Sequence, residues 1–67
     1  MEANTNNTIQ DAMSALLLAL GFDAMAHGVK TEQSADVLAR YAKVILRNSP
    51  EAMRAALLAQ FRAAKLA

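Results

Sequence analysis

The stretch SALLLALGFDAMAHG, residues 14–28, decides how this chain folds. Wound as a helix, it presents apolar side chains almost all the way round, and Asp23 is its only charged residue before His27. A helix that is hydrophobic on every side is normally buried on every side. The stretch therefore predicts two burial surfaces on one helix, and a chain of 67 residues cannot easily supply both.

Gly21, in the middle of this stretch, is open to two interpretations. It can end a short helix at Leu20, with Asp23 capping a further turn. Alternatively, it can lie inside one long helix, at a cost of about 1 kcal/mol relative to alanine. Gly28 is followed by an apolar residue, which is typical of a helix that closes in a Schellman motif. Because Gly28 provides the better stop, we expect one helix over residues 8–27.

Capping residues indicate where the helices begin and end. Thr8 can cap the first helix, and Thr31 can cap the second. Ser49, Pro50 and Glu51 form the clearest boundary, since Ser caps helices, Pro suits the first helical position and Glu favours the first turn. The expected helices cover residues 8–27, 31–48 and 50–66.

The domain organisation follows from these boundaries. Residues 1–7 are polar and are expected to form a flexible N-terminal tail, and residues 8–67 form a single helical domain. No alternating apolar and polar pattern typical of strands is present. The predicted fold class is therefore all-α, a small domain of three helices that homodimerisation completes.

Helical periodicity assigns the apolar residues to faces. The faces expected in the core consist of Ile9, Met13, Leu16, Leu17, Leu20 and Ala24 in the first helix, Val37, Leu38, Tyr41, Val44 and Ile45 in the second, and Met53, Leu57 and Phe61 in the third. Beside the last of these faces lies a row of small residues that allows close approach of another helix: Ala52, Ala56, Ala59 and Ala63.

A second apolar stripe on the first helix predicts an interface. Leu18, Phe22 and Met25 have the i, i+4, i+7 spacing by which helices dock on other proteins. Leu58 lies among the charged residues of the third helix and extends this surface. We expect these four residues to form the protein interface, with Phe22 as the anchor because large aromatic side chains tend to dominate binding energy.

The composition favours an oligomer. Hydrophobic residues make up 55% of the chain and charged residues 19%. Small domains usually add disulfides, a metal or oligomerisation to a marginal core. The chain has no Cys, and its single His cannot build a zinc site alone, so we expect no metal and no cofactor. A homodimer remains as the expected source of stability.

Charge is distributed unevenly along the chain. Residues 1–29 contain acidic residues but no Lys or Arg, and all seven basic residues follow from Lys30 onward. Arg40, Lys43 and Arg47 lie on one narrow stripe of the second helix. Such a stripe is usually a solvated ridge, and it is also a possible contact for phosphates or for an acidic protein surface.

Enzymatic and membrane functions find little support. Asp23 and His27 can face each other at i, i+4, but a metal site needs further ligands and acyl transfer needs a nearby nucleophile. The longest uncharged apolar run, residues 12–22, is about half of the ~20 residues that span a bilayer. With no basic segment before that run, as a secretory signal would have, we expect a cytoplasmic protein that is not an enzyme.

Protein–protein interaction is the function that these observations favour. The chain is expected to be a small accessory protein, an adaptor or inhibitor of a larger, unidentified protein. The alternative is a small helical protein that binds nucleic acid or regulates transcription through its basic C-terminal half. Against this alternative, the start of the third helix offers only Arg54 as a plausible base contact, whereas recognition helices carry their readers there.

Overall fold

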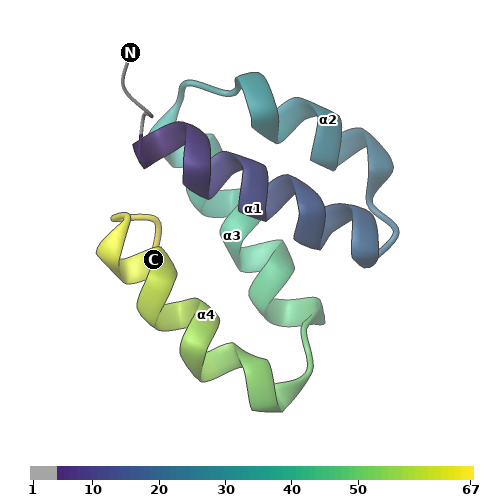
Figure 1. Ribbon diagram of the computed structural model, residues 1–67, viewed down its shortest axis with the longest axis vertical. Coiled ribbons are helices and arrows are strands. Elements are labelled where there is room, and N and C mark those ends of the chain that lie inside the picture. The colour runs from purple at the N-terminus through teal and green to yellow at the C-terminus, as the bar shows by residue number, and fades with distance from the viewer. Residues whose placement is uncertain (1–4) are drawn as a thin grey trace.

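The fold is entirely helical in the part of the chain that the computed structural model describes, residues 5–67, with side chains from Thr8 onward. Figure 1 shows α1 (Thr5–Ala19), α2 (Asp23–Thr31), α3 (Ala35–Asn48) and α4 (Glu51–Ala63). The all-α prediction is confirmed, but the expected number of helices is wrong. The tail expected over residues 1–7 falls largely outside the described residues. Because α1 begins at Thr5, Thr8 lies inside the helix and does not cap it.

The expected long helix is broken at Gly21. Its φ of +91° lies in the left-handed region, which glycine adopts without the steric cost that a Cβ adds. The amide of Gly21 donates to the carbonyl of Leu18 at 3.0 Å, and the amide of Phe22 donates to that of Leu17 at 2.8 Å. These two bonds define a Schellman motif. Gly28, the predicted stop, lies inside α2, so the prediction of one continuous first helix is wrong.

After the break, α2 folds back along α1 as an antiparallel hairpin (Figure 1). Two buried polar side chains of α1 hold it there. The hydroxyl of Ser14 donates to the carbonyl of Ala26 at 2.8 Å. Nε2 of Gln10 donates to the carbonyls of Val29 at 2.8 Å and Glu32 at 2.7 Å. Since the last carbonyls of a helix lack partners within it, Gln10 caps the end of α2 from the neighbouring helix.

α3 begins at Ala35, four residues later than expected. The hydroxyl of Ser34 accepts a hydrogen bond from the amide of Val37 at 3.4 Å and so caps the helix. Thr31, the predicted cap, is the last residue of α2, and that prediction is wrong. Where α3 meets α2, a Cβ added at Gly28 would lie 3.0 Å from Oη of Tyr41. Gly28 therefore gives the tyrosine room to pack against α2.

The predicted boundary between the last two helices is confirmed, although its caps differ from those expected. α4 begins at Glu51, and Pro50 takes the N-cap position. The hydroxyl of Ser49 donates back to the carbonyl of Ile45 at 2.6 Å instead of capping α4. Nε of Arg54 donates to the carbonyl of Ser49 at 3.2 Å and ties the first turn of α4 to the connection.

α4 closes with the same motif as α1, but Lys65 stands where α1 has a glycine. Lys65 has a φ of +63°, and its amide donates to the carbonyl of Arg62 at 3.0 Å. The amide of Leu66 donates to the carbonyl of Phe61 at 2.7 Å. Leu66 is buried and supplies the apolar contact typical of the motif. The last helix therefore ends at Ala63, short of the predicted residue 66.

The core takes one side from each helix. The predictions for Leu57 and Phe61 are confirmed, whereas Ala24 is exposed and Met53 is 44% exposed. Met53 lies in the first turn of α4, at the end of the molecule away from the α1–α2 hairpin (Figure 1). The buried hydrophobic residues are Met13, Leu17, Ala26, Val29, Leu38, Ala42, Ile45, Leu57, Phe61 and Leu66.

Candidate functional site

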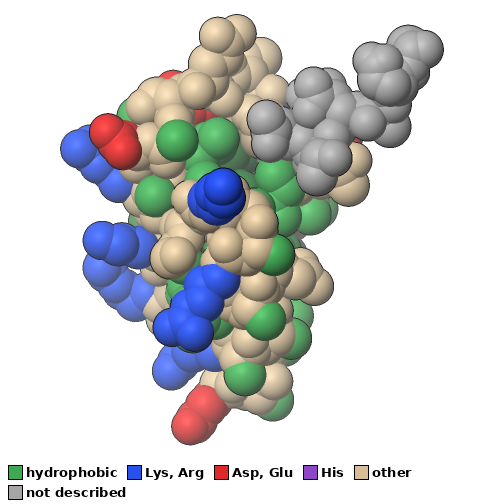
Figure 2. Space-filling view, turned by 90° about the vertical axis from the view of Figure 1, so that its left-hand side faces the viewer, with side chains coloured by type: hydrophobic (Ala, Val, Ile, Leu, Met, Phe, Trp, Pro, Cys, Tyr) green, Lys and Arg blue, Asp and Glu red, His purple; other side chains and the backbone are tan. Residues whose placement is uncertain are grey.

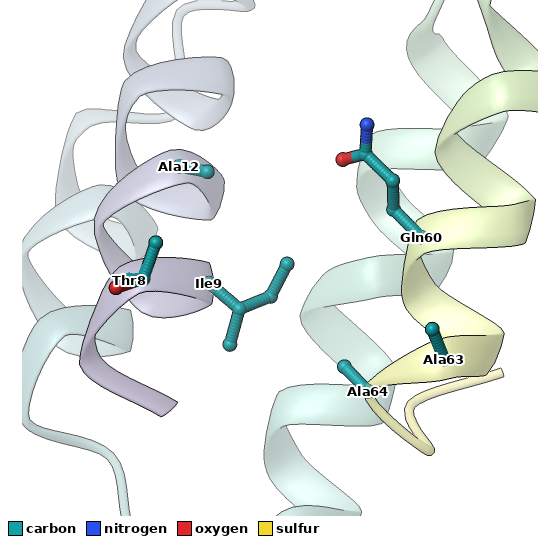
Figure 3. A pocket seen from close by; sticks show the side chains of 6 residues that line it. All are labelled: Thr8, Ile9, Ala12, Gln60, Ala63 and Ala64. Atoms are coloured by element: carbon teal, nitrogen blue, oxygen red, sulfur yellow. The ribbon is translucent and has the colours of Figure 1, made fainter. Parts of the chain in front are cut away.

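A groove opens between the first half of α1 and the last turn of α4. It has a volume of about 330 Å³. In Figure 3 the side chain of Ile9 points from α1 toward α4, and that of Gln60 extends from α4 toward α1. None of the lining residues is charged, so the groove suits an apolar group, with the Gln60 amide available for a hydrogen bond at its edge. The lining residues are Thr8, Ile9, Ala12, Gln60, Ala63 and Ala64.

α4 borders this groove with a side that carries no charge. Its core side holds Leu57 and Phe61. Arg62 lies two residues, and so about 200° around the helix, from Gln60, which places the charge away from the groove. Between them lies what we call the uncharged side of α4, which consists of the exposed residues Ala52, Met53, Ala56, Ala59, Gln60 and Ala63.

α1 presents a similar side. Ala12, Ala15 and Ala19 are exposed, and Leu16 beside them is half-buried. Asp11 is the one charged residue in the sequence of α1, and it lies about 100° around the helix from Ala12. A helix side that faces water normally carries charged residues. The uncharged sides of α1 and α4 thus extend the groove into a wider apolar surface, as interaction sites do.

The four residues expected to form the protein interface are not aligned as predicted. Leu18 is 50% exposed near the end of α1. Phe22 and Met25 come after the break at Gly21 and lie half-buried against the core. Leu58 is half-buried in α4. The stripe depended on a continuous helix, so the break removes it, and Phe22 contributes to the packing of its own domain.

The basic residues occupy a different part of the surface. Arg40, Lys43 and Arg47 are all exposed along the side of α3 opposite its buried residues. Figure 2 views the molecule from the side on which α4 lies. Lys and Arg side chains spread over the left-hand and central parts of this view, with hydrophobic side chains between them and to their right. The predicted basic stripe is thus a solvent-facing ridge.

Among the described residues, the side chains that could ligate a metal are not clustered. Within residues 8–67, no group of three or more His, Cys, Asp or Glu side chains is placed to hold a metal ion. Asp23 and His27 are both exposed on α2. Across the described helices, none combines the length and the apolar character needed to cross a membrane.

Comparison with known proteins assigns no family to the chain. No protein-family model matches it, and no curated protein or solved structure is significantly similar to it. The candidate site therefore rests on its geometry.

Sequence reasoning missed the groove because its residues come from two helices and had other expected roles. Thr8 was expected to cap a helix and Ile9 to lie in the core. Helical periodicity identifies the alanine row that contains Ala63, and it indicates close approach of another helix. The structure shows that no described helix of the same chain covers that row, and it is this exposure that distinguishes a binding surface from a packed one.

Proposed function

We propose that this chain is a non-enzymatic protein–protein interaction module, an adaptor or inhibitor of a larger protein, and that it acts as a homodimer. The observation that supports the proposal is the exposed, uncharged surface of α1 and α4 around the groove. Contiguous apolar surface on a small domain is typical of a site where another molecule binds.

The groove fits a helical segment of the larger protein. An amphipathic helix binds by placing apolar side chains into a groove between two helices. At about 330 Å³, this groove is near the lower end of the ~300–1,000 Å³ of ligand pockets. Because it is open to solvent along the surface, it suits side chains that project from a helix better than it suits an enclosed substrate.

Homodimerisation is supported by the small core and by the apolar residues that stay exposed. In α4, Met53 is a large hydrophobic residue with nearly half of its surface in water. Covering apolar surface contributes about 25 cal/mol per Å². In a domain of this size, whose core alone is marginal, that contribution is a substantial fraction of the stability.

Paired glutamate variants test the groove. Ala12→Glu places a charge in the groove, and Ala24→Glu places the same charge on an exposed position of α2, outside the groove and outside the uncharged sides of α1 and α4. Both positions are exposed, so both variants should unfold at the wild-type denaturant concentration. In affinity capture from the native cell, we expect wild type and Ala24→Glu to retain the same partner and Ala12→Glu to lose it. Equal capture by both variants, or no specific partner for wild type, would contradict the proposal.

Sedimentation equilibrium tests the homodimer. As the concentration rises through the micromolar range and above it, we expect the mass to approach twice the 7.2 kDa of one chain. A 7.2 kDa species at every concentration would contradict this part of the proposal.

Nucleic-acid binding is a second candidate, supported by the exposed row of Arg40, Lys43 and Arg47. Cations in one row can contact successive phosphates, and such binding weakens steeply with salt. The first turn of α4 offers only Arg54 as a reader for base edges, and Nε of Arg54 already donates to the carbonyl of Ser49. Reversing the three charges tests this candidate. Salt-dependent DNA binding by the wild type that this variant loses while folded would favour nucleic acid over protein as the partner.

A further inference from the structure

The exposed side chains of α4 are complementary to themselves when two copies of the helix run antiparallel. In a twofold pair, a residue that contacts a second residue across the interface is contacted by it in return. One register brings Glu51 opposite Arg62 and Met53 opposite Gln60, because both pairs are centred between Ala56 and Leu57 along the helix. A single alignment therefore matches a charged pair and places Met53 against the side chain of Gln60 at once.

The helical positions of these residues agree with that register. Glu51 and Arg62 are eleven residues apart, about three turns, so they lie on the same flank of α4. Met53 and Gln60 are seven residues apart, about two turns, and lie on the flank that borders the groove. All four side chains are exposed. Only small side chains lie between the two flanks, which allows close approach of a second helix.

We propose that α4 pairs antiparallel with α4 of a second copy, and that Met53 of the second copy forms a third wall of the groove. This inference rests on the proposed function, because it defines the homodimer and completes the site for the larger protein. Gln60 lines the groove on α4, so the methionine that meets Gln60 lies at the edge of the groove. Each copy then completes the groove of the other.

Charge favours this pairing over the alternatives. In a parallel pair, Glu51 would meet Glu51 of the second copy and Arg62 would meet its own equivalent. The antiparallel pair replaces these repulsions with two symmetric ion pairs. A nucleic acid would gain little from the uncharged side of α4, because phosphates need cations. A second copy is thus the occupant that this surface fits.

The size of the surface predicts a weak dimer. A helix of 13 residues is about 20 Å long, and a helix pair of that length buries on the order of 500 Å² per copy. The total is close to the lower limit of about 1,000 Å² for a specific interface. We therefore expect a dissociation constant in the micromolar range.

Cysteine cross-linking tests the arrangement, because the chain has no Cys of its own. Ala56→Cys places a thiol next to the twofold axis, so oxidation should give a covalent dimer. Ala52→Cys is the matched control, since the two copies of residue 52 lie about 13 Å apart along the helices, beyond the ~7 Å Cα separation that a disulfide allows. Cross-linking of both variants would indicate a parallel pair, and cross-linking of neither would indicate another surface. Either result overturns the proposal.

Charge reversal tests the register. Glu51→Arg and Arg62→Glu should each weaken the dimer about tenfold in sedimentation equilibrium, and the double variant should restore it. The rescue cannot come from the helix itself, because each substitution opposes the helix dipole and the double variant opposes it at both ends. Loss of affinity without rescue would show that the two residues do not pair.

Met53→Ser tests the third wall, with Leu18→Ser as its control at a second large exposed hydrophobic residue. We expect Met53→Ser to weaken both the dimer and the capture of the larger protein, and Leu18→Ser to leave both unchanged. Dimers that neither cross-link at Ala56 nor show the charge rescue would overturn the α4 surface while homodimerisation stands. Monomers at every concentration would overturn both. Dimers that capture no partner would contradict only the proposed function.

Discussion

Substituting Gly21 with alanine should lower the stability of the domain by about 1 kcal/mol. The residue has a φ of +91°, and an added Cβ would have no heavy atom within 4 Å. The cost is therefore that of the backbone alone, about 1–2 kcal/mol for a side chain in the left-handed region. Lower chain entropy in the unfolded state recovers part of that cost.

The sign of this change distinguishes the broken helix from the continuous one. In a continuous helix over residues 8–27, the same substitution would stabilise the domain by about 1 kcal/mol, because alanine is the better helix former. For a domain of this size, 1 kcal/mol corresponds to a shift of about 4–8 °C in Tm. Urea and thermal unfolding followed by circular dichroism measure it, at equal protein concentrations because the proposed dimer makes Tm depend on concentration. An unchanged or raised Tm would refute the Schellman closure at Gly21.

Lys65 supplies the matched control, because it occupies the same position of the same motif with a side chain present. Its φ is +63°. Lys65→Gly should raise stability by about 0.5–1 kcal/mol, the relief of left-handed strain less the added entropy of the unfolded chain. Lys65→Ala keeps the Cβ and should give no such gain. A loss of stability in Lys65→Gly would show that the lysine side chain contributes more than its backbone strain costs.

Three further predictions test the packing by the same unfolding measurements. Gln10→Met should cost about 1–3 kcal/mol, because it leaves the carbonyls at the end of α2 without their side-chain donor, and an unchanged stability would mean that water replaces Gln10. Phe61→Ala should lower stability by about 3–5 kcal/mol. Met53→Ala, measured at protein concentrations below the dissociation constant of the dimer, should change stability by less than about 0.5 kcal/mol. Similar losses in the two variants would show that Met53 is a core residue. Gly28→Ala should not stabilise the wild-type domain, because the hydroxyl of Tyr41 lies 3.0 Å from the new Cβ. In a Tyr41→Phe background, the same substitution should raise stability by about 1 kcal/mol. Equal effects in both backgrounds would exclude that contact.

The helix count could not be predicted because two glycines in one stretch carry the same local signal. Gly21 is followed by Phe22 and Gly28 by Val29, so both offer the apolar contact of a Schellman motif. What separates them lies elsewhere in the chain. Gly28 is needed as a helical residue with no side chain, because Tyr41 from α3 approaches it. Local patterns do not contain that contact.

Periodicity predicted which side of α4 faces the core, but not how much of that side the rest of the domain covers. The covered length depends on the direction in which the helix runs. Leu57, Phe61 and Met53 share one periodic pattern, and only the first two are buried. The angle at which α4 leaves the turn at Pro50 decides how far along the helix the rest of the domain reaches. The groove depends on the same angle, so neither its position nor its lining follows from periodicity.

The attachments of α4 connect stability to the proposed function. Buried hydrogen bonds from Ser14 and Gln10 hold the α1–α2 hairpin together. Among the described helices, α4 lies close along its backbone to α3 alone, and it is anchored by Leu57, Phe61 and the turn at Leu66. Elements with few buried contacts open first. By mass action, a second copy that pairs with α4 would stabilise the conformation in which α4 is packed against the rest of the domain. Since α4 is also a wall of the groove, the proposed dimerisation and the proposed binding of a larger protein would be linked, and each would raise the affinity of the other by the same factor.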